Sequence, residues 1–539
     1  VLGTSNPLKI NYYPRNATKQ IVTWSAEENQ NILTINENTG EITALSKGQT
    51  RVSAYNEETK QTRECLITVV APAGNIDLAA NIKLTSQWIE ENFKNFQVDY
   101  QSSWDWDVLA MKRAGQSISP YYMESLKNYL LNDSSINTNI AGLAKSGLVL
   151  AANKYDLTAF AGKDLVDLIY NSSSANMHKS GLNGPVYALL LADAGKLDLS
   201  GKAWDRDKLI AAVLEYQQGS AFSLLKGTDA KLDVDSSALA LTALAPYYKQ
   251  NGREVVTTAI DSAKTWLSKV QLSSAGFKSY FDEECSESPA QVIIALSSLG
   301  IDLKGNPSAW DTPFIKANTN LLQNLDMYSH RDGGVKHILS DAKGNSFSSQ
   351  QALMAYVSYD RLINKQTAFY DFSDIKADDN SLLKALIAEY DKLSPNDYTS
   401  QSWAACQTAK TAIDSTLLAN SDGRQQEIDA AYLSLDKAMK NLIKNHAQTS
   451  GDIAISGSAD NWQIALTGLA NITMDANFTG KLFTDMSAIN DAALGLLVKD
   501  GSSVELTIPQ GVKITSNNKN MEVLTPMILT DKYLADLKG

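Results

Sequence analysis

The feature that most constrains the fold is a repeated segment of small, apolar residues. Five copies align without gaps and bring one alanine of each into register: Ala152, Ala192, Ala243, Ala295 and Ala355. Each copy is apolar on nearly all faces, as a buried helix must be, and more charged, amphipathic segments lie between the copies. With an earlier copy at residues 103–115, six inner helices alternate with six outer ones. Such helix pairs cannot bury their faces alone, so we predict a closed α/α toroid over residues 76–374.

The segments on either side of the predicted toroid have other patterns. Residues 1–72 alternate apolar and polar side chains between glycine-containing turns, which predicts a small β-sandwich. Residues 375–445 have helical periodicity, and residues 449–539 return to strand-like alternation. The sequence therefore predicts four domains in line: an all-β sandwich, the toroid, a small helical module and a small β domain of unassigned family. The segment 'APAGN' at residues 71–75 is the expected first linker.

Three of these domains resemble known families. Residues 1–72 contain 'VTWS…TINENTGEITALSKGQTRVSAY', which resembles the bacterial Ig-like group 2 domain. That resemblance makes Trp24 the core tryptophan and Gly40 and Gly48 the turn glycines. The toroid contains 'QLSSAGFKSYFDEECSESPAQVIIALSSLGID', which is similar to the repeat of prenyltransferases and squalene cyclases. Within that superfamily it looks closest to bacterial surface proteins related to the cobalamin carriers intrinsic factor and transcobalamin.

The helical module contains the turn 'YTSQSW' and resembles the FIVAR module of Gram-positive surface proteins. Tyr398, Thr399 and Trp403 stand at the signature positions of that module. FIVAR modules are regarded as spacers or carbohydrate-binding units, and the spacer interpretation is the commoner one.

Composition excludes several partner classes. The net charge of −12 over 539 residues argues against nucleic acid and anionic membranes as partners. No apolar run approaches the roughly 20 residues that span a bilayer. Cys65, Cys285 and Cys406 fall in separate regions, and His178, His330 and His337 stand at no ligand spacing around Cys285. We therefore expect neither a disulfide framework nor a zinc-ligand set, and predict no metal.

The stretch 'KLDVDSSALALTAL' puts Asp233 and Asp235 just ahead of an inner helix. Class II terpene cyclases, which it resembles, carry Asp-x-Asp-Asp there, and the middle Asp protonates an alkene. Asp235 matches that middle residue, but Ser236 replaces the last carboxylate, so catalysis is not expected and Asp235 is only an outside candidate. The alternative is that Asp235 is the helix N-cap, with Glu287 at the equivalent place before the next inner helix.

Inner-helix N-termini of a toroid ring one mouth, where polar side chains can face a ligand. In the cobalamin carriers an Asp matching Asp235 contacts the corrin amides, so the resemblance implies a polar ring made of Asp235, Glu287, Ser288, Gln291 and Gln350. Tyr187 would be an aromatic wall, and Trp104 and Trp106 would stand at the rim, although paired tryptophans are more often core residues. His330 and His337 flank the Gly333-Gly334 turn and are expected to be lone surface-loop histidines, with a metal or corrin ligand as the alternative role.

The sequence therefore predicts a non-catalytic binding protein. Its toroid would hold a small molecule, with a corrinoid as one candidate, and its accessory modules would be spacers or glycan binders that meet a cell wall or host surface. The alternatives are an adhesin or spacer with an inert toroid, and a terpenoid cyclase-like enzyme. Ig-like and FIVAR modules predict an extracellular or cell-surface location of Gram-positive type, with no anchor visible. The start at Val1 without a signal peptide leads us to expect a fragment of a longer protein.

Overall fold

The computed structural model describes two compact units, residues Val1–Lys376 and Ala377–Gly539. Between residues 5 and 442 it leaves out short segments, and beyond residue 442 it describes only the backbones of strands. The longest segments left out before residue 442 are 11–20, 27–31, 70–75, 94–99 and 305–312. The predicted linker at residues 71–75 lies outside the described residues.

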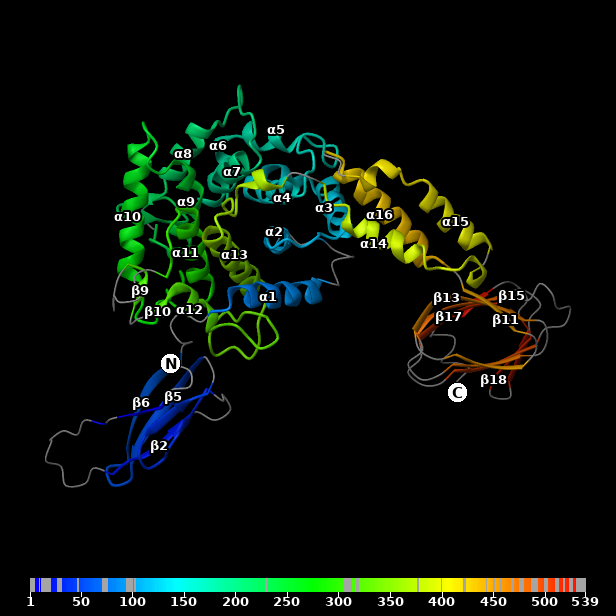
Figure 1. Ribbon diagram of the computed structural model, residues 1–539, viewed down its shortest axis with the longest axis horizontal. Coiled ribbons are helices and arrows are strands. Elements are labelled where there is room, and N and C mark those ends of the chain that lie inside the picture. Colours follow the sequence, from blue (N-terminus) through cyan, green and yellow to red (C-terminus); the bar gives the residue numbers. More distant parts are fainter. Residues whose placement is uncertain are drawn as a thin grey trace. The chain divides into compact units, whose positions relative to one another are not determined.

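The first domain is a small β domain of two three-stranded sheets (Figure 1). One sheet has the order β1 (Ser5–Pro7), β4 (Glu41–Ala44), β3 (Leu33–Ile35), and the other β2 (Thr23–Ala26), β5 (Gly48–Asn56), β6 (Gln61–Val69). Trp24 is buried between them, as predicted. Gly40 has φ +69°, and a Cβ there would lie 2.6 Å from the Trp24 ring, so the turn requires glycine. Gly48 is the first residue of β5.

Six buried helices form a ring in the second domain, and each packs against the next. They are α2 (Trp104–Arg113), α4 (Ile140–Ala152), α7 (Asn183–Ala194), α9 (Val234–Leu244), α11 (Glu287–Ser298) and α13 (Ser346–Ile363). Small residues allow the close approach: a Cβ on Gly147 of α4 would lie 2.6 Å from the Leu191 side chain of α7. Because α13 also packs against α2, the ring closes (Figure 1).

The outer layer alternates with the inner ring along the chain. Its helices are α1 (Leu78–Phe93), α3 (Pro120–Asn132), α5 (Leu165–Tyr170), α8 (Arg206–Leu214), α10 (Glu254–Val270) and α12 (Leu321–Asp326). Connections add the short helix α6 (Ser174–Met177) and two small hairpins, β7 (Gln217–Gln218) with β8 (Ala221–Phe222) and β9 (Ile315–Lys316) with β10 (Thr319–Asn320). This arrangement is the toroid-like architecture that the repeat register predicts.

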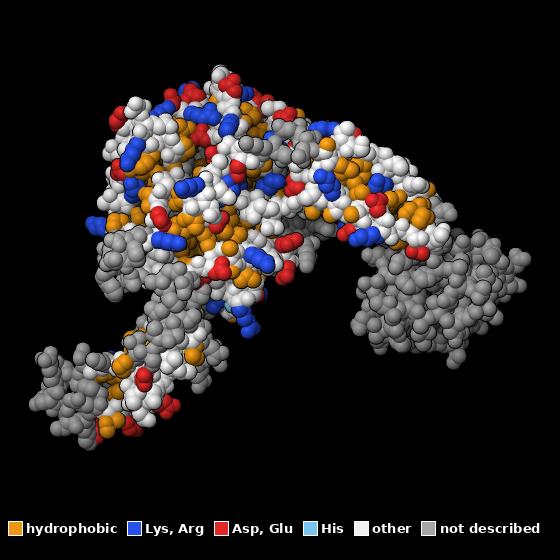
Figure 2. Space-filling model, viewed as in Figure 1, with side chains coloured by type: hydrophobic (Ala, Val, Ile, Leu, Met, Phe, Trp, Pro, Cys, Tyr) orange, Lys and Arg blue, Asp and Glu red, His pale blue; other side chains and the backbone are white. Residues whose placement is uncertain are grey.

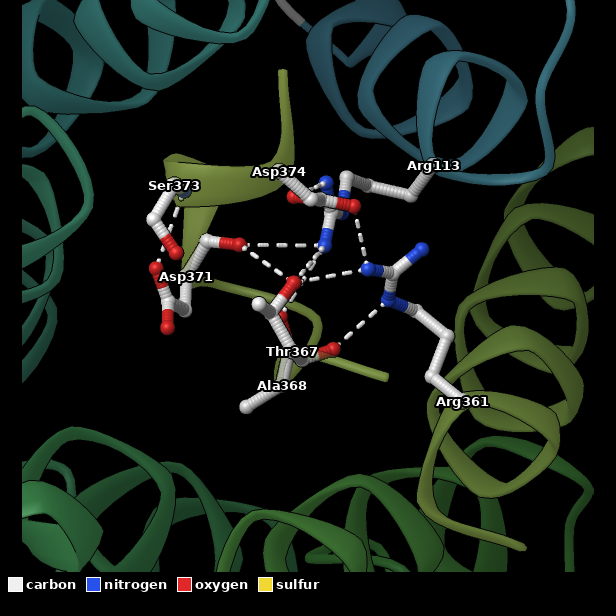
Figure 3. Close-up of polar contacts among 7 residues, drawn as sticks. All are labelled: Arg113, Arg361, Thr367, Ala368, Asp371, Ser373 and Asp374. Carbon is white, nitrogen blue, oxygen red and sulfur yellow. Dashed lines mark hydrogen bonds and ion pairs between the residues drawn. The ribbon is translucent and has the colours of Figure 1, made fainter. Parts of the chain in front are cut away.

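A polar cluster joins the end of α2 to the chain that follows α13, and we call Arg113, Arg361, Thr367 and Asp374 the latch (Figure 3). Arg113 donates to Asp374 Oδ1 at 2.8 Å, and Arg361 donates to Asp374 Oδ2 at 2.5 Å. The same two arginines also donate to the hydroxyl of Thr367, at 3.2 and 2.7 Å. One oxygen of Asp374 is therefore paired with an arginine 261 positions earlier and the other with an arginine 13 positions earlier, where the ring closes.

The second unit begins with three helices, α14 (Ser381–Tyr390), α15 (Ser400–Thr411) and α16 (Gln425–Lys440). The rings of Tyr390 and Tyr398 both stack on Trp403, with centroids 5.4 and 6.0 Å away. This aromatic stack and the buried Cys406 belong to the core of the three helices. Thr399, the remaining predicted signature residue, lies outside the described residues.

The last part of the chain contains strands in two five-stranded sheets. One sheet has the order β11 (Lys444–Gln448), β13 (Ser458–Leu466), β15 (Thr479–Asp485), β17 (Ser503–Ile508), β20 (Met527–Leu529). The other has the order β12 (Gly451–Ile455), β14 (Ala470–Met474), β16 (Ala493–Val498), β18 (Lys513–Ser516), β19 (Lys519–Glu522). Successive strands alternate between the sheets and pair in parallel up to β17 and β18. Such alternation is typical of a β-solenoid coil.

Candidate functional site

The start of α9 carries two carboxylates with different roles. Asp233 has an extended backbone, with φ −136°, and its side chain accepts a hydrogen bond from the Ser236 amide at 2.8 Å. Asp233 is therefore the N-cap, and Asp235 lies in the first turn of the helix. The interpretation of Asp235 as the cap is wrong, because the extended residue that precedes the first turn is two positions earlier.

Asp235 is half-buried, and its Oδ1 atom is buried without a hydrogen-bond partner among the described residues. Burial, together with the charges of Asp233 and Glu287, raises the pKa of this carboxyl to about 7, although a hydrogen bond with Ser288 lowers it. A carboxyl group with this pKa is substantially protonated at neutral pH and can donate a proton. We call Asp233, Asp235 and Glu287 the acid site.

Glu287 begins α11 and is buried, at 4% exposure. Its Oε1 accepts a hydrogen bond from the Ser348 hydroxyl at 2.5 Å, and its Oε2 lies 2.8 Å from His337 Nδ1. The N-cap position of α11 is Ser286, which makes no side-chain capping bond. The prediction of Glu287 as a cap is therefore also wrong. Its partners tie the beginnings of α11 and α13 together at the acid site.

His337 and Cys285 join this cluster. One ligand atom from each of Cys285, Glu287 and His337 lies within 4.8 Å of the other two. Burial raises the pKa of the Cys285 thiol to about 12, so it carries its proton at neutral pH in the metal-free protein. His337 is thus not the lone surface histidine that we expected. The signal was present only in the repeat register, because both residues precede neighbouring inner helices.

The other polar residues predicted to face a ligand are bonded to the protein. Ser288 is fully buried, with its hydroxyl 3.5 Å from Cys285 Sγ. Gln291 is half-buried and donates to Gln351 Oε1 at 3.0 Å. Gln350 is 1% exposed. When its side-chain amide is oriented to donate, the amide nitrogen lies 3.0 Å from Asp107 Oδ2. Gln350 therefore links α13 to α2, because ring closure places a carboxylate against it.

The predicted aromatic residues are half-buried and pack against the main core. The Trp106 ring meets the Tyr187 ring edge-on, with centroids 5.1 Å apart. Burial raises the pKa of Tyr187, although water still touches its side chain. Tyr187 is therefore largely enclosed by protein, with part of its side chain still accessible to solvent. Trp104 packs on the same core, which favours the structural interpretation of the tryptophan pair.

Sequence reasoning missed the carboxylates of α2. Asp105 is fully buried and accepts hydrogen bonds from the hydroxyls of Tyr100 at 2.6 Å, Tyr122, and Ser146 at 2.9 Å. Asp107 is also fully buried, and burial raises the pKa of its carboxyl well above the usual value. The pattern 'SWDWD' carried both residues, but only the two tryptophans were singled out. Because Asp105 accepts hydrogen bonds from three hydroxyl groups, we interpret it as a residue that stabilises the fold.

Two depressions lie away from the predicted residues. A cavity of about 110 Å³ lies between α1, α12 and α13, and an open depression of about 590 Å³ follows α10, where Trp266 lies among polar side chains. On the face seen in Figure 2, basic and acidic side chains are interspersed over the helical parts, with no continuous basic stripe. Among the described residues, no helix is long and apolar enough to cross a membrane.

Comparisons with known proteins give a family for the first domain and a fold likeness for the helical one. Residues 2–66 match the bacterial Ig-like domain (group 2). No curated protein matches the chain. An unsaturated glucuronyl hydrolase from Bacillus sp. GL1, described as responsible for glycosaminoglycan degradation, is 11% identical over 55% of this chain and 98% of its own, with a TM-score of 0.38.

A family 76 glycoside hydrolase from a bovine Bacteroides thetaiotaomicron strain is 11% identical over 65% of this chain and 94% of its own, with a TM-score of 0.34. A polysaccharide lyase is 11% identical over 64% of this chain and 61% of its own, with a TM-score of 0.30. The helical domain thus has a toroid-like fold that resembles those of glycan-degrading enzymes.

These comparisons contradict the prediction of a non-catalytic binding protein, because the structures that resemble the toroid are hydrolases and a lyase. The cobalamin-carrier and terpenoid-cyclase interpretations receive no support from them. The predicted polar ring remains a prediction of ligand contacts. Most of its members are already bonded within the protein, and Asp235 is the member with an unpartnered oxygen.

Proposed function

We propose that the helical domain is a glycan-cleaving enzyme in which Asp235 is the proton donor. The observation that supports this proposal is the state of Asp235: a half-buried carboxyl with an unpartnered oxygen, beside the carboxylates of Asp233 and Glu287. Cleavage of a glycosidic bond needs a carboxylic acid that stays protonated near neutral pH next to a second carboxyl group. The acid site supplies both kinds of group.

In the proposed reaction, Asp235 gives its proton to the glycosidic oxygen as the bond from that oxygen to the anomeric carbon breaks. Water then adds to the anomeric carbon, and the Asp235 carboxylate takes the released proton, which restores the acid. Neighbouring negative charge from Asp233 stabilises the positive charge that develops on the sugar ring. The half-buried rings of Tyr187 on α7 and Trp106 on α2 meet edge-on and supply apolar surface of the kind that ligand sites commonly have.

We take the substrate class from the proteins of similar fold, which are named as enzymes that degrade glycans. An unsaturated uronic acid at a chain end and a neutral glycan chain are two substrates to distinguish by experiment. The first is followed by loss of its ultraviolet absorbance and the second by new reducing ends. A lyase activity would instead increase that absorbance.

The decisive experiment compares the full chain with its Asp235→Asn variant on a panel of glycosaminoglycan-derived and neutral oligosaccharides. Loss of a general acid should lower kcat by roughly 10²–10⁴-fold with little change in KM. Asp261→Asn is the matched control, because Asp261 is exposed on the outer helix α10. The proposal is overturned if no glycan is cleaved, or if Asp235→Asn cleaves at the rate of the control.

We also propose that residues 375–445 form a FIVAR module and that the protein works outside a Gram-positive cell. The stack of Tyr398 on Trp403 fits the module's signature turn, and the bacterial Ig-like domain at residues 2–66 fits a surface protein. Fractionation of the native cells tests the location: protein found only in the cytosolic fraction would overturn it.

A further inference from the structure

Two loops of neighbouring repeats bring a thiol, a carboxylate and an imidazole together at the beginnings of α11 and α13. Cys285 and Glu287 come from the first loop and the first turn of α11, and His337 comes from the second loop. Cys285 is 1% exposed and Glu287 4% exposed, whereas His337 is partly open to solvent. The cluster is therefore closed on the protein side and accessible from one direction.

The two loops are held in place by bonds that do not involve the cluster's own side chains. The Ser286 amide donates to the His337 carbonyl at 3.0 Å, which pins one loop to the other. The His337 amide donates to Asp341 Oδ2 at 3.1 Å. The positions of Cys285 and His337 thus follow from the backbone, and the site is organised before any ligand arrives.

We propose that Cys285, Glu287 and His337 bind a divalent cation of the zinc class. One potential ligand atom from each residue lies within 4.8 Å of the others, so a small shift of the side chains gives each a bond to a shared ion. Thiolate, imidazole and carboxylate together favour Zn²⁺ over the oxygen-preferring Mg²⁺ and Ca²⁺. Three protein ligands leave a fourth tetrahedral position open to water or to a ligand.

Two further groups fit a bound ion. His337 Nε2 lies 3.9 Å from Glu283 Oε2, in reach of the carboxylate that commonly orients a metal-binding histidine through its other nitrogen. The hydroxyl of Tyr328 is fully buried and has no hydrogen-bond partner in the described part of the chain. Burial, with Glu284, Cys285 and Glu287 nearby, raises the pKa of this hydroxyl.

Cobalt binding tests the proposal without any measurement of activity, so its outcome is separate from that of the glycan assay. The full chain is freed of metal with a chelator and titrated with Co²⁺. We expect one equivalent to give a thiolate-to-cobalt charge-transfer band in the near ultraviolet and the strong visible bands of tetrahedral cobalt. One equivalent of Zn²⁺ should remove both.

The variants decide which residues hold the ion. Cys285→Ser should abolish the charge-transfer band, and His337→Gln should weaken cobalt binding at least about 100-fold, more than the loss of an outer-shell partner. Cys406→Ser and His178→Gln are the matched controls, because both residues lie outside the cluster, and both should bind as the wild type does. His337 is partly exposed, so its variant folds even where Cys285→Ser does not. The absence of the band in the wild type, or its persistence in His337→Gln at wild-type affinity, would overturn the proposal.

Discussion

Two charged clusters of the toroid, the latch and the acid site, differ in how their carboxylates are paired. In the latch, both oxygens of Asp374 meet an arginine, and although burial would raise the pKa of this carboxyl, the hydrogen bonds and charges of Arg113 and Arg361 hold it below its usual value. In the acid site, Asp233 and Asp235 each keep a buried oxygen without a partner among the described residues, and the pKa of Asp235 is raised. Buried charge that serves stability is paired, so unpaired charge indicates chemistry.

The largest effect should come from breaking the latch. Arg113→Met removes a buried cation and the hydrogen bonds that it donates to Asp374, Thr367 and two backbone carbonyls, while the exposed Asp374 keeps Arg361. Loss of these bonds should cost about 3 kcal/mol in total. Thermal unfolding of the full chain, followed by helical circular dichroism, should show the toroid transition at a clearly lower temperature. Lys278→Met is the control, because its pair with Asp282 is exposed and is worth roughly 0–1 kcal/mol. Equal melting of the two variants would show that the latch does not hold the ring.

The second largest effect should be a gain in the stability of the toroid, not a loss. The folded pKa of Asp235 is about 7, above that of an unfolded aspartate, so the folded state binds more protons between these values and loses stability as the pH rises. Asp235→Asn keeps the neutral shape at every pH. In metal-free protein it should therefore stabilise the toroid by on the order of 2 kcal/mol at pH 8 and by little at pH 4.

Melting curves of wild type and Asp235→Asn across that pH range measure this difference, with Asp261→Asn as the exposed control. A variant that destabilises the toroid equally at all pH values would mean that Asp235 is held as a charged, structural group. The acid site would then resemble the latch, and the contrast between the two clusters would disappear.

The same contrast explains what the sequence could predict. The ring followed from the alanine register of the repeats, which is a local pattern set by burial. The choice between Asp233 and Asp235 as the cap depended on which residue is extended, and both stand before the same apolar helix. Cys285 and His337 meet because neighbouring repeats share an edge of the ring, and Arg113 meets Asp374 because the ring closes. In the last domain, the alternation of apolar and polar side chains is the same for parallel and antiparallel strands. The parallel pairing could therefore not be inferred from the sequence.

A smaller effect should follow from loss of the cap itself. Asp233→Ala removes the acceptor of the Ser236 amide and should cost about 0.5–2 kcal/mol at neutral pH. Asp205→Ala is the matched change on α8, where Asp205 accepts from the Lys208 amide and is more exposed. The loss at Asp233 should be the smaller of the two, because the substitution also removes a buried oxygen that has no partner. A larger loss at Asp233 would mean that its second oxygen is satisfied in solution.

The smallest effect concerns the coupling within the acid site. Asp233→Ser keeps an N-cap acceptor, so stability should stay close to that of the wild type, but it removes a negative charge that raises the pKa of Asp235. The pKa of Asp235 should therefore fall, by less than about one pH unit since burial is the larger cause. The midpoint of the pH-dependent stability in metal-free protein reports this shift, and Asp205→Ser, the same exchange on an outer helix, should leave it in place. An unchanged midpoint in Asp233→Ser would show that the two carboxylates do not interact, and burial alone would then account for the acidity of the site.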